Sequence, residues 1–262
     1  MRVLITGAAR AIGAATADEL TRRGHHVVAT ARDPSLLEAV PAAQRLALDV
    51  TDQASVQAAL ARAGELDAVV NNAGVTAAGP LEAFPLDRVR AVLETNTLGP
   101  LRLVQALVGG WRERGSGVIV NVSSVQGRVA TPLEGIYSAS KYALEALSET
   151  LHYELAHFGI RTVIIEPGYI SPGMKPADSF EGPAAYRGLW DQWSGTDEKV
   201  TGPGGRSGPD LVAAAIAGAV EDPDTPLRVP VGPDAEMVLA TRAQLDDATF
   251  ESTMRAALDL TW

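Results

Sequence analysis

The chain has 262 residues, a formal net charge of −10 at neutral pH, 46% hydrophobic residues and no cysteine. Its length and apolar content fit one large α/β domain, so we expect residues 1–262 to form a single domain. The negative charge argues against a nucleic-acid surface, which needs clustered Lys and Arg. The lack of cysteine excludes disulfides, thiolate metal sites and a cysteine nucleophile.

The first residues, "MRVLITGAAR", lack the charged region, apolar run and cleavage site of a signal peptide. No apolar run approaches the length of a membrane span. We therefore expect a cytoplasmic protein with no membrane partner.

Short apolar runs alternate with longer amphipathic segments along the chain. Buried strands are predicted at 3–6, 26–30, 45–50, 66–71, 117–123, 161–167 and 227–231. Helices are predicted at 11–24, 52–64, 85–111 and 137–159. Apolar strands separated by helices indicate a parallel sheet covered on both faces. The expected fold is a doubly wound α/β sheet of the Rossmann type, which binds ligands beyond the carboxyl ends of its strands.

Residues 171–209 interrupt this alternation with many Gly and Pro residues. Loops of that length are uncommon in compact domains and tend to be functional or disordered. Phe180, Tyr186, Trp190 and Trp193 make complete disorder less favoured. We expect a lid containing short helices.

Two motifs follow predicted strands. The stretch "VLITGAARAIGAAT" places Gly7 at the end of the first strand and Gly13 at the start of the first helix, where free N–H groups suit a pyrophosphate. The sequence Asn71-Asn72-Ala73-Gly74 follows the fourth strand. It is either an Asx turn leaving the strand or part of a ligand site.

These motifs, together with Ser124, "YSASK" at 137–141 and "PG" at 167–168, occur in the order typical of one family. The chain resembles the classical short-chain dehydrogenase/reductase family over about its first two-thirds. The stretch that starts at Tyr137 is similar to the hydroxysteroid- and retinol-oxidising branch. The resemblance implies a dinucleotide-binding, catalytic Rossmann domain and a homodimer or homotetramer, with helices 85–111 and 134–159 partly buried between subunits.

The glycine turn departs from the family pattern T-G-x-x-x-G-x-G, because Ala11 replaces the middle glycine. Its methyl group either crowds the dinucleotide or requires the backbone to keep a negative φ.

Cofactor choice depends on the end of the second strand. NAD-binding members carry an acid there, which bonds the ribose hydroxyls, whereas this chain has Ala31 followed by Arg32. Arg32 and Arg10 can grip a 2′-phosphate by charge-assisted bonds. We therefore expect NADP(H), although Asp33 keeps NAD(H) open.

The resemblance also implies the other cofactor contacts. The expected set is Gly7, Arg10, Ile12, Gly13, Arg32, Asp49, Val50, Asn71, Ala73, Gly74, Tyr137, Lys141, Pro167, Gly168 and Ile170. Asp49 is expected to border the adenine, but local turn capping is the alternative. Where family members often carry Thr beyond Ile170, this chain has Pro172, and Ser171 is a possible substitute.

A phenol and an amine are spaced for catalysis. Tyr137 and Lys141 lie four residues apart, so a helix places them on one face. A free tyrosine has a pKa of about 10, and a neighbouring ammonium is expected to lower it, which would make Tyr137 the acid/base. Ser124, thirteen residues earlier, can bond the substrate oxygen. Each of these residues alone has an ordinary structural explanation.

Asn96 is predicted to complete the catalytic set. Asparagine is a poor residue inside a helix, and the family places such an Asn at a helix irregularity as a proton relay. The nearby Gly99-Pro100 pair is an alternative cause of a kink.

The predicted function is hydride transfer between NADP(H) and the carbonyl or secondary alcohol of a hydrophobic small molecule, with ketones, aldehydes and steroid-like compounds as the candidates. No metal site is expected, since the four His residues show no ligand pattern. One alternative is a non-catalytic dinucleotide sensor of the same fold. Another is an epimerase or dehydratase of the extended branch, which normally needs a longer C-terminal region.

Overall fold

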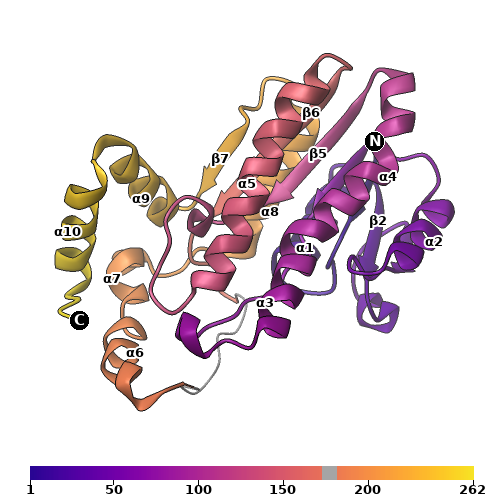
Figure 1. Ribbon diagram of the computed structural model, residues 1–262. Helices are drawn as coiled ribbons and strands as arrows, with labels where there is room; N and C mark the ends of the chain where they lie inside the picture. Colours follow the sequence, from indigo (N-terminus) through magenta and orange to yellow (C-terminus); the bar gives the residue numbers. More distant parts are fainter. Residues whose placement is uncertain (173–181) are drawn as a thin grey trace.

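The computed structural model describes residues 1–172 and 182–262. In these residues seven strands form one parallel sheet in the order β3-β2-β1-β4-β5-β6-β7 (Figure 1). Their bounds are Arg2–Ile5 (β1), His26–Ala31 (β2), Gln44–Ala47 (β3), Ala68–Asn71 (β4), Gly117–Val122 (β5), Ile160–Pro167 (β6) and Arg228–Val231 (β7). The predicted doubly wound fold is confirmed.

Helices connect the strands and cover the sheet. The α-helices are Ala11–Arg22 (α1), Gln53–Ala63 (α2), Leu86–Leu93 (α3), Gly99–Arg114 (α4), Gly135–Ala156 (α5), Arg187–Trp193 (α6), Asp197–Thr201 (α7), Pro209–Glu221 (α8), Pro233–Gln244 (α9) and Asp247–Leu258 (α10). Short helical turns lie at Pro34–Leu37 (η1), Leu81–Ala83 (η2), Glu94–Leu98 (η3), Val125–Gly127 (η4), Ala184–Tyr186 (η5) and Gly202–Gly204 (η6). The predicted strands start and end within a few residues of the observed ones.

Successive strand residues point to opposite faces, which gives the sheet two apolar layers. Val3 and Ile5 of β1 pack in the layer that includes Leu20 of α1 and Ile216 of α8. Leu4, between them, packs in the layer beneath α2, α4 and α5. Residues in both layers are almost fully buried, so the sheet holds its loops on a rigid base.

The helix predicted at 85–111 is interrupted. A π-helical turn at Glu94–Leu98 separates α3 from α4. Pro100, in the first turn of α4, has no N–H to continue a regular ladder. Thr97 Oγ1 in this turn donates a hydrogen bond to the Ser140 carbonyl of α5 at 2.9 Å. The irregularity therefore docks on the helix that carries Tyr137 and Lys141.

The chain after β6 supplies α6, α7, α9 and α10, which gather at one end of the molecule in Figure 1. The expected short helices are present as α6 and α7 within 171–209. Trp190 and Trp193 are half-buried there. Phe180, with the rest of 173–181, lies outside the described residues.

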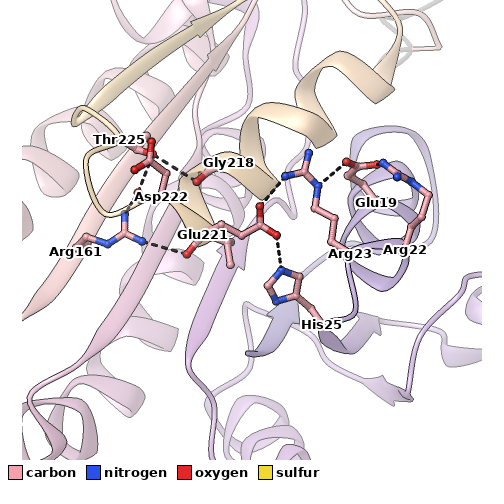
Figure 2. Close-up of polar contacts among 10 residues, drawn as sticks. Glu19, Arg22, Arg23, His25, Arg161, Gly218, Glu221, Asp222 and Thr225 are labelled. Atoms are coloured by element: carbon pink, nitrogen blue, oxygen red, sulfur yellow. Dashed lines mark hydrogen bonds and ion pairs between the residues drawn. The ribbon is translucent and has the colours of Figure 1, made fainter.

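Charged side chains form ion pairs and hydrogen bonds at the opposite end of the sheet (Figure 2). Glu221, at the end of α8, accepts from Arg23 Nη1 at 2.7 Å and lies 2.9 Å from His25 Nε2. Arg23 also pairs with Glu19 of α1 at 2.7 Å. Arg161 of β6 donates to the carbonyls of Val220 in α8 and of Asp222, the residue that follows the helix. The contacts of Arg23 and Glu221 tie the carboxyl end of α1 to that of α8, and those of Arg161 tie β6 to the same end.

Over residues 1–172 and 182–262, the structure contains no helix that combines the length and apolarity needed to cross a bilayer.

Candidate active site

A cavity of about 490 Å³ runs along the carboxyl ends of the strands. We call it the main cavity. The predicted site residues that line it are Gly7, Arg10, Ile12, Arg32, Asp49, Val50, Ala73, Gly74, Ser124, Tyr137, Lys141, Pro167, Gly168 and Ile170. The fold thus brings together residues spread over more than 160 positions of sequence.

Gly13, Asn71 and Asn96 belong to the predicted set but do not line this cavity. A Cβ on Gly13 would lie 2.3 Å from the Gly7 carbonyl oxygen, so Gly13 permits α1 to pack against the glycine turn. Asn71 is buried and donates to Asn121 Oδ1 at 2.8 Å, which joins β4 to β5.

Asn72, absent from the predicted contacts, lines the cavity. Its Nδ2 donates to the carbonyls of Thr6 and Gly7 at 2.9 and 3.1 Å and so holds the glycine turn against β4. Gly7 has φ +64°, a conformation that favours glycine. The first turn of α1 faces the cavity without a side-chain cap at Arg10. Its free N–H groups fit an anionic ligand.

Ala11 adopts φ +45°, not the negative φ considered from sequence. The backbone follows the conformation that a glycine would take there, because the turn between β1 and α1 requires it. This conformation is strained for alanine. Alanine in place of glycine at position 11 therefore strains the backbone of the turn and also adds a methyl group to the turn.

Three charged residues surround the end of β2. Arg10 and Arg32 are exposed, line the main cavity and form no ion pair within residues 1–172 and 182–262. Asp33 also lines the cavity, but its Oδ1 accepts hydrogen bonds from Ser35 N at 3.0 Å and Ser35 Oγ at 2.7 Å. These bonds hold the pKa of Asp33 below its ordinary value. Its carboxylate is thus engaged as the cap of η1.

Asp49 lies both at the cavity and in a local turn. It lines the main cavity. Its Oδ1 also accepts from Thr51 N at 2.9 Å and Thr51 Oγ1 at 2.8 Å, which fixes the turn after β3. Asp52, rather than Asp49, caps α2 by accepting from Ala54 N.

Past the end of β6, Ile170 and Pro172 line the cavity, whereas Ser171 does not. Ser171 N donates to the Ser207 carbonyl at 2.9 Å. A Cβ on Gly168 would lie 2.2 Å from Asp234 Oδ2, so only glycine fits between the cavity and α9.

Tyr137 and Ser124 both line the main cavity. Ser124 follows β5 and caps η4 by accepting from Gln126 N at 3.1 Å. Tyr137 lies in the first turn of α5 and is 6% exposed. Burial raises the pKa of Tyr137 above its ordinary value, the Ser124 hydrogen bond lowers it, and the charge of Glu134 raises it. The lowered pKa expected from sequence is therefore not observed, because burial dominates.

Lys141 lies one helical turn after Tyr137. Its Nζ is 5.7 Å from the centroid of the Tyr137 ring and donates to the Val122 carbonyl at 2.8 Å. Burial lowers the pKa of Lys141 to about 8, and Glu145 opposes this shift. The amine is held beside the phenol at the base of the main cavity.

Asn96 lies in the π-helical turn and is 1% exposed. Its Oδ1 accepts from Val75 N at 2.9 Å, and its Nδ2 donates to the Val75 carbonyl and to Ser140 Oγ. A Cβ on Gly74 would lie 3.5 Å from Asn96 Oδ1 and 3.9 Å from Lys141 Nζ. Asn96 and Lys141 thus flank the same small space beside Gly74.

Two polar residues not anticipated from sequence also line the main cavity. Gln126 Nε2 donates to Glu134 Oε2, while Gln126 Oε1 accepts from Ser138 Oγ at 3.0 Å. Burial raises the pKa of Glu134 above its ordinary value. Only the position of Glu134, three residues before Tyr137, could have indicated from the sequence that it lies at the site.

A second, mostly apolar cavity of about 80 Å³ adjoins the main one, and we call it the side cavity. Ser124, Gln126, Gly168 and Tyr169 line both cavities. The apolar wall of the side cavity is formed by Val125, Val129, Trp193, Val200, Val238, Met254 and Leu258. It therefore extends from Ser124 between η4 and the C-terminal helices.

A buried carboxyl pair lies behind the cavity, where α5 meets β6. Glu145 and Glu166 are 4% and 1% exposed. Arg228 Nε lies 3.0 Å from Glu145 Oε2 and 3.8 Å from Glu166 Oε1, and Arg128 Nη1 lies 3.6 Å from Glu166 Oε1. Burial, followed by the neighbouring Glu145, raises the pKa of Glu166 to about 7.

Comparison with known proteins identifies the family. The family model described as short chain dehydrogenase matches residues 1–180. The chain belongs to the short-chain dehydrogenase family. The resemblance predicted from the motifs is confirmed, and this membership makes the protein an oxidoreductase.

Named relatives span most of the chain. A 3-ketodihydrosphingosine reductase of Bacteroides thetaiotaomicron is 31% identical over 97% of this chain and 96% of its own. Human retinol dehydrogenase 8 is 35% identical over 76% of this chain and 66% of its own. The solved gluconate 5-dehydrogenase of Burkholderia cenocepacia, in complex with NADP and tartrate, is 30% identical with a TM-score of 0.73, over 90% and 95% of the two chains. The predicted nicotinamide cofactor agrees with this short-chain dehydrogenase complex.

Proposed function

We propose that this short-chain dehydrogenase transfers hydride between NADP(H) and the carbonyl or carbinol carbon of a small hydrophobic molecule. The main support is the arrangement of Ser124, Tyr137 and Lys141 around one cavity. The remainder of that cavity suits the family's nicotinamide dinucleotide, because the glycine turn lines the cavity and the first turn of α1 lacks a side-chain cap. When bound, the cofactor supplies or accepts the hydride.

The residues would act on the substrate oxygen. Ser124 would orient the oxygen by a hydrogen bond, and the phenol of Tyr137 would give it a proton as the carbonyl is reduced. Because burial keeps the Tyr137 pKa high, the phenol is protonated at neutral pH and is ready to act as the acid. Lys141 would stabilise the phenolate that remains. Asn96 and Lys141 would hold a proton relay beside Gly74, a position that both side chains flank.

The charges around β2 favour NADP(H) over NAD(H). Arg10 and Arg32 are available to a 2′-phosphate at the cavity wall. Asp33, the acid that kept NAD(H) open, is engaged by Ser35. A carboxylate that caps its own turn is less able to bond ribose hydroxyls.

An apolar substrate is supported by the side cavity, whose wall is mostly hydrophobic. The names of two relatives, a 3-ketodihydrosphingosine reductase and a retinol dehydrogenase, agree with such substrates. We also propose the single domain over 1–262, the cytoplasmic location and a homodimer or homotetramer. Exposed apolar side chains on α4, α5 and their neighbours, such as Tyr153 at 74% exposure and Leu98 at 43%, support the assembly.

The decisive test compares the wild type with Tyr137→Phe across a panel of ketones and aldehydes. Reduction is followed by nicotinamide absorbance with NADPH and NADH in parallel. We expect the variant to bind NADPH nearly as well while hydride transfer falls by about 100- to 10,000-fold, the usual contribution of a general acid. Normal turnover by the variant would remove Tyr137 from the chemistry, and a preference for NADH would refute the role of Arg10 and Arg32.

A further inference from the structure

Glu134 lies where the main cavity meets the side cavity. It lines the main cavity, Thr131 lines the side cavity, and Gln126 lines both. Gln126 Nε2 and Thr131 Oγ1 both donate to one carboxyl oxygen of Glu134, Oε2. The structure gives the other oxygen, Oε1, no hydrogen bond from residues 1–172 and 182–262. One face of the carboxyl group is fixed and the other is available to a ligand.

Within the described ranges, no Lys or Arg pairs with Glu134. A half-buried carboxylate without a cation is unfavourable, because burial penalises its charged form. Its charge also opposes ionisation of Tyr137. An ammonium group from a ligand would relieve both effects, since it would pair with the carboxylate beside the phenol.

The positions of the two cavities set the order of groups along a ligand. Ser124 and Tyr137 would hold the reacting oxygen, and Ser124 also lines the side cavity. Glu134 is the N-cap residue of α5, three residues before Tyr137. Both residues line the main cavity, and the charge of Glu134 acts on the Tyr137 phenol. A substrate whose chain enters the side cavity therefore places the atoms next to its reacting carbon near Glu134.

We propose that Glu134 binds a cationic nitrogen on the carbon next to the reacting carbon, so that the preferred substrate is an α-amino ketone, or a β-amino alcohol in the reverse direction, whose apolar chain occupies the side cavity. This inference rests on the proposed function and specifies its substrate class. In oxidation Tyr137 acts from its phenolate form, which the ligand's ammonium group and Lys141 would stabilise. The O–H proton passes to this phenolate while the carbinol C–H leaves as hydride to NADP⁺. The ammonium group forms and breaks no covalent bond, and Glu134 acts only in binding.

The test uses stable alcohols with the same carbon chain: 1-aminohexan-2-ol, hexane-1,2-diol and hexan-2-ol. Oxidation with NADP⁺ gives kcat/KM for each with the wild type and with Glu134→Gln, which keeps an acceptor for Gln126 and Thr131. The wild type should prefer the amino alcohol over hexan-2-ol, and the variant should lower that ratio by at least about tenfold, as expected for the loss of one charge-assisted bond. Glu154→Gln, an exposed change on the same helix, should leave the ratio unchanged.

Different outcomes separate the two proposals. If the wild type oxidises hexan-2-ol as well as the amino alcohol, or if the ratio is unaltered in Glu134→Gln, the role of Glu134 is overturned while hydride transfer stands. An equal preference for the diol and the amino alcohol would also overturn the charge pairing. If Tyr137→Phe oxidises these alcohols at the wild-type rate, the proposed function fails. Absence of wild-type turnover with all three alcohols would overturn the substrate class.

Discussion

The two ends of the parallel sheet carry polar side chains in different environments. At the amino ends, Glu19, Arg23 and Glu221 form ion pairs at the surface between α1 and α8. At the carboxyl ends, Tyr137 and Lys141 are nearly buried, and burial is the largest influence on the pKa of each. Glu19, Arg23 and Glu221 at the amino ends each have an oppositely charged partner. At the carboxyl ends, Lys141 forms no ion pair with the described residues.

The two ends of the sheet therefore differ in how their polar groups affect the stability of the fold. Exposed ion pairs contribute roughly 0–1 kcal/mol each, so the contacts between α1 and α8 can change with little effect on the fold. Buried polar groups with few partners destabilise a protein unless something compensates. Their concentration at the carboxyl ends of the strands agrees with a site that completes its interactions when ligands bind.

The largest effect expected from this comparison, after loss of the phenol itself, comes from Gly74→Ala. The added methyl group would lie 3.5 Å from Asn96 Oδ1 and 3.9 Å from Lys141 Nζ, which are ordinary contacts, so it fills the proposed relay space without a clash. We expect kcat to fall by about tenfold, part of the usual acid–base contribution. Unfolding stability should stay the same or rise slightly.

Steady-state kinetics and urea unfolding of the same preparations check this prediction. Gly110→Ala, at an exposed position of α4 with no atom near the added methyl group, is the matched control. An unchanged kcat in Gly74→Ala would mean that no relay passes between Asn96 and Lys141.

The next effect concerns stability and pH. Glu166 has a pKa of about 7 in the folded protein, above its ordinary value of 4.5. Between these values the unfolded chain releases the proton while the folded chain keeps it, so stability falls as pH rises from 4.5 to 7 and then levels off. We expect Glu166→Gln to flatten this dependence by an amount on the order of 1–3 kcal/mol.

Urea unfolding between pH 5 and pH 8 measures this difference. Glu149→Gln is the control, because Glu149 contacts the same Arg228 but is 46% exposed. A wild-type stability that rises over this range would contradict the raised pKa of Glu166.

The smallest effect is expected at the other end of the sheet. Hydrogen bonds from His25 and then Arg23 lower the pKa of Glu221, so its contribution is present above pH 4.5 and is lost as pH falls through the lowered value. Glu221→Gln should cost less than about 1 kcal/mol at neutral pH, and added salt should reduce the difference. Thermal unfolding at low and high salt checks this, and a loss of several kcal/mol would contradict the comparison.

Much of this molecule could be predicted from its sequence because its signals are local. Apolar strand runs and helix ends predict the parallel sheet. Helical spacing predicts that Tyr137 and Lys141 share one face, and the family resemblance adds Ser124 to them. An irregularity near Asn96 was also predictable, because asparagine, glycine and proline stand close together in a long helix. Only the structure shows that it is a π-helical turn.

Other features depend on packing between distant segments. Asn71 faces Asn121, fifty residues away, rather than the cavity. The positive φ of Ala11 is set by the path of the turn between β1 and α1, and the residue types in the turn do not predict that path. The raised pKa of Tyr137 depends on how many atoms cover the phenol. Glu134 carries no motif, and its importance becomes visible only when Gln126 and Thr131 are found beside it.

The wall of the side cavity and the residues proposed to react come from different parts of the chain. The wall that would meet a substrate's tail includes Met254 and Leu258 of α10, whereas the reacting groups lie on α5. Ninety residues, 157–246, separate these two helices. Under the proposed function, an exchange of α10 between homologous proteins, or its redesign in the laboratory, would alter which molecules are accepted and leave Tyr137 and Lys141 unchanged.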